Sequence, residues 1–178
     1  YKTANPRDLL AFAASLRMLP PIKKQLADFK GSLLKELYDE LDTLDDLEAL
    51  ISSAIIEDPP LVIREGGIIK DGYNEDVDKL RRSKTEGKNW LAELEAKERE
   101  RTGIKTLTNA ERFITQELKE LEDLILGAED KLAALEYELF CDVRDRVASQ
   151  VERIQKTARA VALLDVIASL SFVAERQN

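Results

Sequence analysis

The sequence lacks histidine altogether and has a single cysteine, Cys141. Histidine is the commonest general base and metal ligand, so its absence disfavours acid–base catalysis and most transition-metal chemistry. One cysteine cannot form a disulfide within the chain, which fits a reducing, cytoplasmic setting. With no histidine to activate it, Cys141 is expected to be a small buried hydrophobe. The sequence also has no G-x-x-x-x-G-K-[ST] loop and no EF-hand spacing. We therefore expect no catalytic, cofactor or metal site.

Proline and glycine are scarce and unevenly placed. All five prolines lie within the first 60 residues, and neither residue type occurs after Gly127. Since these are the main helix breakers, the asymmetry predicts short helices first and long helices afterwards. Asn5-Pro6 reads as an N-cap followed by proline at the first helical position. The expected helices cover about 6–18, 20–29, 33–56 with a break near 42–43, 75–102, and 112 onward.

Aromatic residues make up only 6% of the chain and charged residues 35%, with a net charge of −8. This composition favours long, solvent-exposed helices and argues against a broad nucleic-acid-binding face. The acidic groups at 39–42 and 45–48 are expected to be solvated helix faces. We find no apolar run of transmembrane length and no signal peptide. The chain begins at Tyr1 without methionine, as an excised fragment would.

Two β-branched runs, Leu61-Val62-Ile63 and Ile68-Ile69, flank the glycine pair Gly66-Gly67. Such a pattern predicts a small hairpin over 61–69. A glycine pair can also belong to a phosphate-binding loop, but Lys70 is not in the required context and no strand–loop–helix frame surrounds it. The turn is therefore the favoured interpretation.

A heptad pattern dominates the second half of the chain. Leu118, Ile125, Leu132 and Leu139 recur every seven residues, with Leu121, Ala128 and Leu135 interleaved at the same period. This a/d seam, with a short connection at 103–108, predicts antiparallel pairing of a helix over 75–102 with one over 112–145. Trp90 is expected to anchor the outgoing helix by packing. The run 160–174 is nearly apolar all round and is expected inside the body of the domain.

The segment Asp58 to Leu107 carries REGGII, DGY and LEAKERERTGIK in order, and it resembles the MutS family of DNA mismatch-repair proteins. Further matching segments are ANPRDLLAF, TNAERFITQELKELE, LGAEDKLAALEYELF and LLDVIASLSFVAE, so the resemblance covers nearly the whole chain. It implies an all-α fold: a helical core with a small β-hairpin and a long protruding antiparallel helix pair, the lever. The implied parts are a core over 1–73 with the hairpin at 61–69, an outgoing lever helix over 74–107, and a returning lever and core helix over 108–178.

The resemblance also implies a function. MutS proteins recognise mismatched double-stranded DNA, couple this to ATP and Mg²⁺, and act with a second MutS-like subunit; a downstream repair protein is a further possible partner. The family's DNA-gripping clamp is expected near 105–108 and is absent from this sequence. The chain would then be a non-enzymatic module that links the ATPase end to the clamp, with no membrane contact. The alternative is a structural helical scaffold or coiled-coil protein-interaction module without DNA function, since heptads alone do not name a function.

One local charge pattern points to DNA. From Lys97 to Arg112 the chain has five basic and three acidic residues, a local +2 within a total of −8. The side chains expected to make weak, non-specific phosphate contacts at the lever tip are Arg99, Arg101, Lys105 and Arg112.

Overall fold

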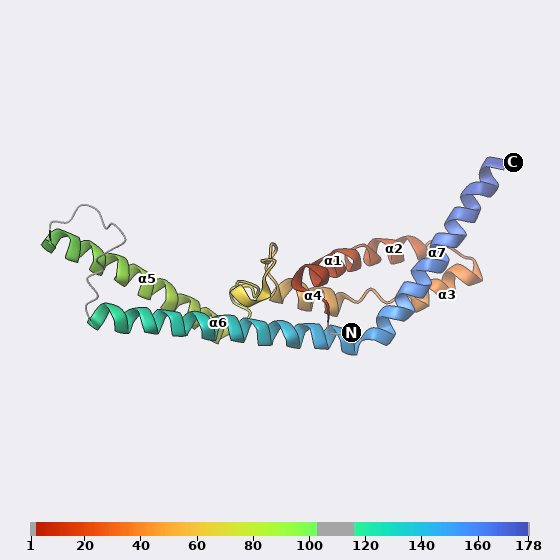
Figure 1. The fold of residues 1–178 in the computed structure, drawn as a ribbon. Helices are drawn as coiled ribbons and strands as arrows, with labels where there is room; N and C mark the ends of the chain where they lie inside the picture. The colour runs from red at the N-terminus through yellow and green to blue at the C-terminus, as the bar shows by residue number, and fades with distance from the viewer. Residues whose placement is uncertain (1–2, 103–115, 178) are drawn as a thin grey trace. The chain divides into compact units, whose positions relative to one another are not determined.

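The computed structural model describes residues 3–102 and 116–177 (Figure 1). These residues form helices with no β-strand longer than one residue, which confirms the all-α class. The elements are α1 Pro6–Leu16, α2 Leu19–Leu26, α3 Ser32–Glu40, α4 Asp45–Ala54, the 3-10 helix η1 Ile63–Glu65, α5 Glu75–Thr102, α6 Gln116–Ser149 and α7 Val151–Gln177. The chain divides into two compact units: the first is Tyr1–Pro59 with Phe140–Asn178, and the second is Pro60–Leu139.

Helix α1 begins where its sequence predicts. The Asn5 side chain accepts a hydrogen bond from the Asp8 backbone at 3.0 Å, and the Asp8 carboxylate accepts one from the Asn5 backbone at 2.9 Å. This reciprocal capping box satisfies two backbone donors that the first helical turn leaves without partners. Pro6 at the first helical position has no N–H to satisfy.

The first unit is built from helices that pack in pairs: α1 on α2 and α4, α2 on α3, and α3 on α7. Their apolar faces meet in one buried cluster, which α7 enters through Ala160. Partly buried side chains of the same helix, among them Ile154, Leu164 and Ile167, pack against that cluster. One face of α7 is thus held by the core through hydrophobic burial. The buried members are Leu16, Leu19, Leu26, Leu37, Leu41, Leu44, Leu47 and Ala160.

The expected break between α3 and α4 is confirmed at residues 41–44. Leu44 has a φ of +54°, a left-handed conformation that is uncommon for a leucine. Its side chain is 1% exposed, and its backbone N–H donates to the Asp42 carboxylate at 3.0 Å. Burial and this hydrogen bond together stabilise the left-handed turn.

The prediction of a hairpin over 61–69 is wrong. Residues Ile63–Glu65 form a 3-10 turn, and Leu61 and Val62 are exposed, whereas Ile68 and Ile69 are fully buried. The backbone N–H groups of Gly67 and Ile68 donate to the Glu136 carboxylate in α6 instead of to a neighbouring strand. A side chain distant in sequence therefore replaces the partner that a hairpin needs, and no local pattern reveals such a partner.

The prediction that the run 160–174 lies inside the body of the domain is wrong for most of its length. Ala160 is 2% exposed, but Leu170 is 66% and Phe172 56% exposed. Only one face of α7 packs on the cluster of the first unit. Trp90, which was predicted to anchor the outgoing helix by packing, is 49% exposed, so only about half of its surface is covered.

The prediction that the chain has no apolar run of transmembrane length is also wrong. By length and composition alone, Val151–Arg176 is long and apolar enough to cross a membrane. Such a stretch is weak evidence for a membrane span, because core helices of globular proteins pass the same test. The stretch includes seven charged residues, and two of them, Arg159 and Asp165, lie in its central part.

Candidate functional site: the helix pair and the helix junction

Helix α5 starts at a cap formed by Asn74. The Asn74 side-chain oxygen accepts hydrogen bonds from the backbone of Asp76 at 3.0 Å and of Val77 at 3.1 Å. Acidic residues in the first turn interact favourably with the helix dipole. The preceding loop is tied to the same turn, because the Gly72 N–H donates to the Asp78 carboxylate at 3.0 Å. The beginning of the outgoing helix is thus fixed by polar contacts.

Helices α5 and α6 run antiparallel where they meet in the second unit. Going along α5, Arg81 pairs with Glu136, Lys84 with Glu129, and Gly87 lies against Ile125. The residue numbers rise along α5 while those of the partners fall along α6. This order confirms the antiparallel pairing within the described residues, and Figure 1 shows the two helices.

Gly87 marks a close approach between the two helices. A Cβ atom at this position would lie 3.0 Å from Cγ1 of Ile125, closer than most real Cβ contacts. Glycine inside a helix costs about 1 kcal/mol relative to alanine. The absence of a side chain here allows Ile125, which is 8% exposed, to bury itself against α5.

Glu129 joins two lysines of α5 across the pair. Its carboxylate lies 3.0 Å from Nζ of Lys84 and 3.1 Å from Nζ of Lys88. Hydrogen bonds from Lys84 and Lys88 hold the pKa of the Glu129 carboxyl below its usual range. These groups are about one-third to one-half exposed, so solvent and salt screen the interaction.

The buried stripe of α6 differs from the heptad seam in one informative way. Ile125 and Leu132 are buried as the seam predicts, whereas Leu135 and Leu139 are only partly buried. Beyond Leu132 the buried positions are spaced by four or three residues: Glu136, Phe140, Val143 and Val147. Glu136 is fully buried, and the heptad pattern does not predict this. The signal was present, because a lone acidic residue lies four residues from Leu132 and four from Phe140 on one helical face.

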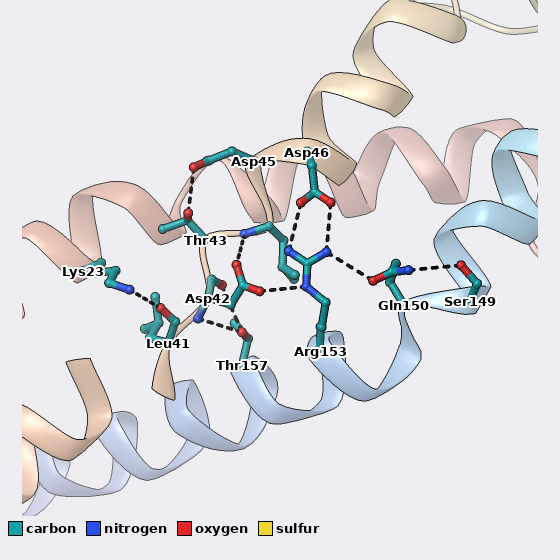
Figure 2. Close-up of polar contacts among 11 residues, drawn as sticks. Lys23, Leu41, Asp42, Thr43, Asp45, Asp46, Ser149, Gln150, Arg153 and Thr157 are labelled. Atoms are coloured by element: carbon teal, nitrogen blue, oxygen red, sulfur yellow. Dashed lines mark hydrogen bonds and ion pairs between the residues drawn. The ribbon is translucent and has the colours of Figure 1, made fainter. Parts of the chain in front are cut away.

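A second polar cluster lies at the junction of α6 and α7 in the first unit (Figure 2). Gln150 alone separates the two helices, and Arg153 extends from the first turn of α7. The Arg153 guanidinium donates to both oxygens of Asp46 at 2.9 and 3.1 Å, and its Nε donates to Asp42 at 2.9 Å. It also donates to the Gln150 side chain at 3.2 Å. One arginine thus connects the helix junction to the turn between α3 and α4.

Thr157 lies one helical turn beyond Arg153 in α7. Its side chain binds the backbone of the segment between α3 and α4. Its hydroxyl accepts from the Asp42 N–H at 3.1 Å and donates to the Asp42 carbonyl at 3.0 Å, and the residue is 3% exposed. From the other side, Nζ of Lys23 donates to the Leu41 carbonyl at 2.7 Å. Side chains from two helices therefore satisfy the backbone of a segment that has no regular structure.

The acidic residues at this junction should make the first unit sensitive to acid. Hydrogen bonds from Arg153 lower the pKa of both Asp42 and Asp46. A carboxyl whose pKa is lower in the folded state stabilises it above the unfolded pKa, near 4, and loses that contribution as pH falls further. We expect Arg153→Gln to lower the melting temperature of the chain at pH 7, and we expect this deficit to shrink as pH falls below about 4.

Arg159→Gln is the matched control, because Arg159 is an exposed arginine of the same helix. Thermal melts of both variants followed by circular dichroism from pH 7 to pH 3 provide the measurement. An Arg153→Gln deficit of equal size at both pH values would contradict the assignment.

The structure does not describe the side chain of any of the four residues predicted to contact phosphate. Arg99 and Arg101 lie in the last turns of α5, but their side chains are not described, and Lys105 and Arg112 lie between the described ranges. Within the described residues, no group of three or more acidic or cysteine side chains is placed to hold a metal ion. Asp42 and Asp46, expected as solvated, instead bind Arg153.

Comparison with known proteins gives one consistent result. A family model described as MutS domain III matches residues 1–171. The DNA mismatch repair protein MutS of Lachnoclostridium phytofermentans is 53% identical over all of this chain, which covers 22% of that protein. The MutS protein of Caldanaerobacter subterraneus is 47% identical over 98% of this chain, which covers 24% of that protein. The MutS protein of Symbiobacterium thermophilum is 47% identical over 97% of this chain, which covers 23% of that protein.

The chain therefore spans less than a quarter of the length of these relatives. The first alignment extends over 210 positions, and the chain has 178 residues, so at least 32 aligned positions (210 − 178) have no residue in this chain. The family match covers almost the whole chain, and the helices described above provide its fold. The chain belongs to the MutS family and corresponds to its domain III.

Proposed function

We propose that this chain is the mechanical link of a MutS protein, joining the part that binds nucleotide to the part that grips DNA. The observation that carries the proposal is α6, an unbroken helix of 34 residues that contributes to both compact units. Its first part pairs with α5, and one residue after its end α7 begins. A hydrogen-bonded helix resists bending, so displacement at one end is passed to the other.

The missing alignment positions support a further part of the proposal. The Lachnoclostridium phytofermentans relative carries at least 32 residues that this chain lacks. We propose that these belong to a DNA-gripping clamp inserted near 105–108, between the outgoing lever helix over 74–107 and the returning segment over 108–178. The core then comprises residues 1–73. The chain itself would carry no catalytic site, and ATP with Mg²⁺ would bind elsewhere in the parent, since the sequence has no G-x-x-x-x-G-K-[ST] loop.

The exposed face of α7 supports docking to the rest of the parent. Leu163, Val166, Leu170 and Val173 are between 43% and 66% exposed and are spaced by three and four residues. We call these four residues the outer stripe. A contiguous apolar stripe of this kind normally meets a partner surface. Because more than three-quarters of each relative lies outside the matched region, we propose that another part of the same protein covers it.

The test of the link is an interruption of α6 by Leu132→Pro in a full-length MutS protein that contains this chain. Release of mismatched DNA on nucleotide binding is the quantity to measure. Nucleotide-driven release equal to that of the unmodified protein would contradict the link.

A second candidate function is a helical scaffold that binds only protein. The outer stripe favours it, since two copies could bury their stripes against each other. Sedimentation velocity of the 178-residue chain between about 5 and 500 μM distinguishes the two, because a homodimer forms with rising concentration. The link proposal expects a monomer, and a stable dimer at the lowest concentration would favour the scaffold.

The lever tip gives a separate prediction about DNA. We propose that Arg99, Arg101, Lys105 and Arg112 attract phosphates weakly, so the chain should bind duplex DNA with an affinity that falls as salt rises. Each lost phosphate contact should reduce the slope of log K against log salt by about 0.9. Replacing the four with glutamine should therefore flatten that slope. The matched control removes four exposed charges elsewhere, at Lys24, Lys30, Lys156 and Arg159. Equal effects of the two sets would refute the tip assignment.

The expected partners follow from the same proposal. Mismatched double-stranded DNA would be bound through other domains of the parent, with a second MutS-like subunit beside it and a downstream repair protein as a further contact. We propose a cytoplasmic setting without membrane contact. Although α7 is apolar, Arg159 and Asp165 lie within it, and each would cost about 2.5–3.5 kcal/mol at the centre of a bilayer.

A further inference from the structure

The glycine pair of the REGGII segment lies directly against α6. Gly66 and Gly67 both have a φ of +73°, a conformation that side chains disfavour. A Cβ atom on Gly66 would lie 2.9 Å from a carboxylate oxygen of Glu136 and 3.5 Å from the Cα of Ala133. Gly67 has open space around it, so it is required only for its backbone conformation. The first glycine thus provides close approach, and both provide the shape of the loop.

The carboxylate of Glu136 is the centre of this arrangement. Its side chain is fully buried. One oxygen accepts from the N–H of Gly67 and, at 3.4 Å, from the N–H of Ile68. The other accepts from the guanidinium of Arg81. A buried carboxylate requires this pairing, because removal from water without compensation is strongly unfavourable.

Arg81 brings the third segment into the network. It lies in α5 and donates to the Ile69 carbonyl at 2.5 Å as well as to the carboxylates of Glu136 and Asp71. The loop 66–72, α5 and α6 therefore all meet at one buried charge. The surface pairs of Glu129 with Lys84 and Lys88 connect only the two helices, and they are partly exposed.

We propose that the buried carboxylate of Glu136 holds loop 66–72 and α5 against α6, so that both are released together when it loses these contacts. We call this arrangement the latch. If the Glu136 carboxylate moves away from these donors, Arg81 and the N–H groups of Gly67 and Ile68 lose their hydrogen-bond acceptor at the same time. The cost of leaving several buried polar groups unpaired makes partial release unfavourable. The attachment of α5 at this point consequently has two states, closed and open. This inference concerns the second unit alone and does not rest on the proposed function.

Amide hydrogen exchange, followed by NMR on the 15N-labelled 178-residue chain, tests the latch. In Glu136→Gln the single side-chain oxygen can accept from the loop or from Arg81, but it cannot serve both as the carboxylate does. We expect the exchange of the Gly67 and Ile68 amides to become about 10- to 100-fold faster, the effect of losing a hydrogen bond to a charged group. The matched control is Glu138→Gln, an exposed glutamate two residues away. It should leave both amides unchanged.

A second pair of variants tests the same contact by changing the loop instead of Glu136. Gly66→Ala forces a methyl group toward Glu136 and strains the backbone, so the same amides should exchange faster. Gly31→Ala is its control, because Gly31 has a φ of −66° and nothing within 4 Å of its would-be methyl group. In both test variants the amides of Ala13 and Ile51, buried in the first unit, should keep their protection.

Two results would overturn the proposal. The first is exchange of the Gly67 and Ile68 amides within about threefold of the unmodified chain in both Glu136→Gln and Gly66→Ala. The second is a uniform loss of protection that includes Ala13 and Ile51, because a latch opens locally and leaves the first unit folded.

Discussion

Replacing Leu132 with proline in a full-length MutS protein that contains this chain should abolish nucleotide-driven release of mismatched DNA. Leu132 is 7% exposed in the middle of α6, and the helix continues for 17 residues on its C-terminal side, to Ser149. Proline removes a backbone hydrogen bond and clashes with the preceding turn, at a cost of about 3 kcal/mol or more. The kink that results would let the two ends of α6 move independently.

The control for this variant is Leu132→Ala, which removes the buried side chain and keeps the helix. We expect a loss of about 2–5 kcal/mol in stability, as for other buried leucines, with release still responding to nucleotide. Stopped-flow fluorescence of labelled mismatched DNA measures the release. If the two variants behave alike, loss of stability explains the defect and the helix has no role in transmission.

Introducing two charges into the outer stripe should disconnect the chain from the rest of its parent. The double variant Val166→Glu, Leu170→Glu places acidic residues at positions that are 52% and 66% exposed in this structure. The isolated chain should unfold within about 0.5 kcal/mol of the unmodified one, because exposed substitutions have small effects. In the full-length protein the same carboxylates would be buried without partners, which costs several kcal/mol. Coupling between DNA binding and ATP hydrolysis should then be lost.

The matched control adds two acidic residues at exposed polar positions of α7 outside the stripe, Gln155→Glu and Ser171→Glu. DNA-dependent ATP hydrolysis and the melting temperature of the full-length protein are the measurements. Intact coupling in the stripe variant would show that no part of the parent covers this face. Equal loss in the control would show that added charge alone is responsible.

The helices were largely predictable because their signals are local. Asn5-Pro6 marked the start of α1, the break near Asp42–Thr43 was expected, and α5 was predicted over 75–102 and found at Glu75–Thr102. Each depends on a cap, a breaker or a period that neighbouring residues define. The break at Gln150 between α6 and α7 was not predicted, because the sequence has neither proline nor glycine there.

What the sequence by itself determined is the helical class, most helix boundaries, the antiparallel pairing and the membership in the MutS family. Only the tertiary structure decided which polar residues hold these helices. Glu136 pairs with Arg81 across 55 positions, and Arg153 pairs with Asp46 across 107. It also decided that the glycine pair receives a carboxylate instead of forming a hairpin. The physical reason is that a helix is formed by hydrogen bonds between near neighbours, whereas the partner of a buried charge is fixed only when distant segments pack.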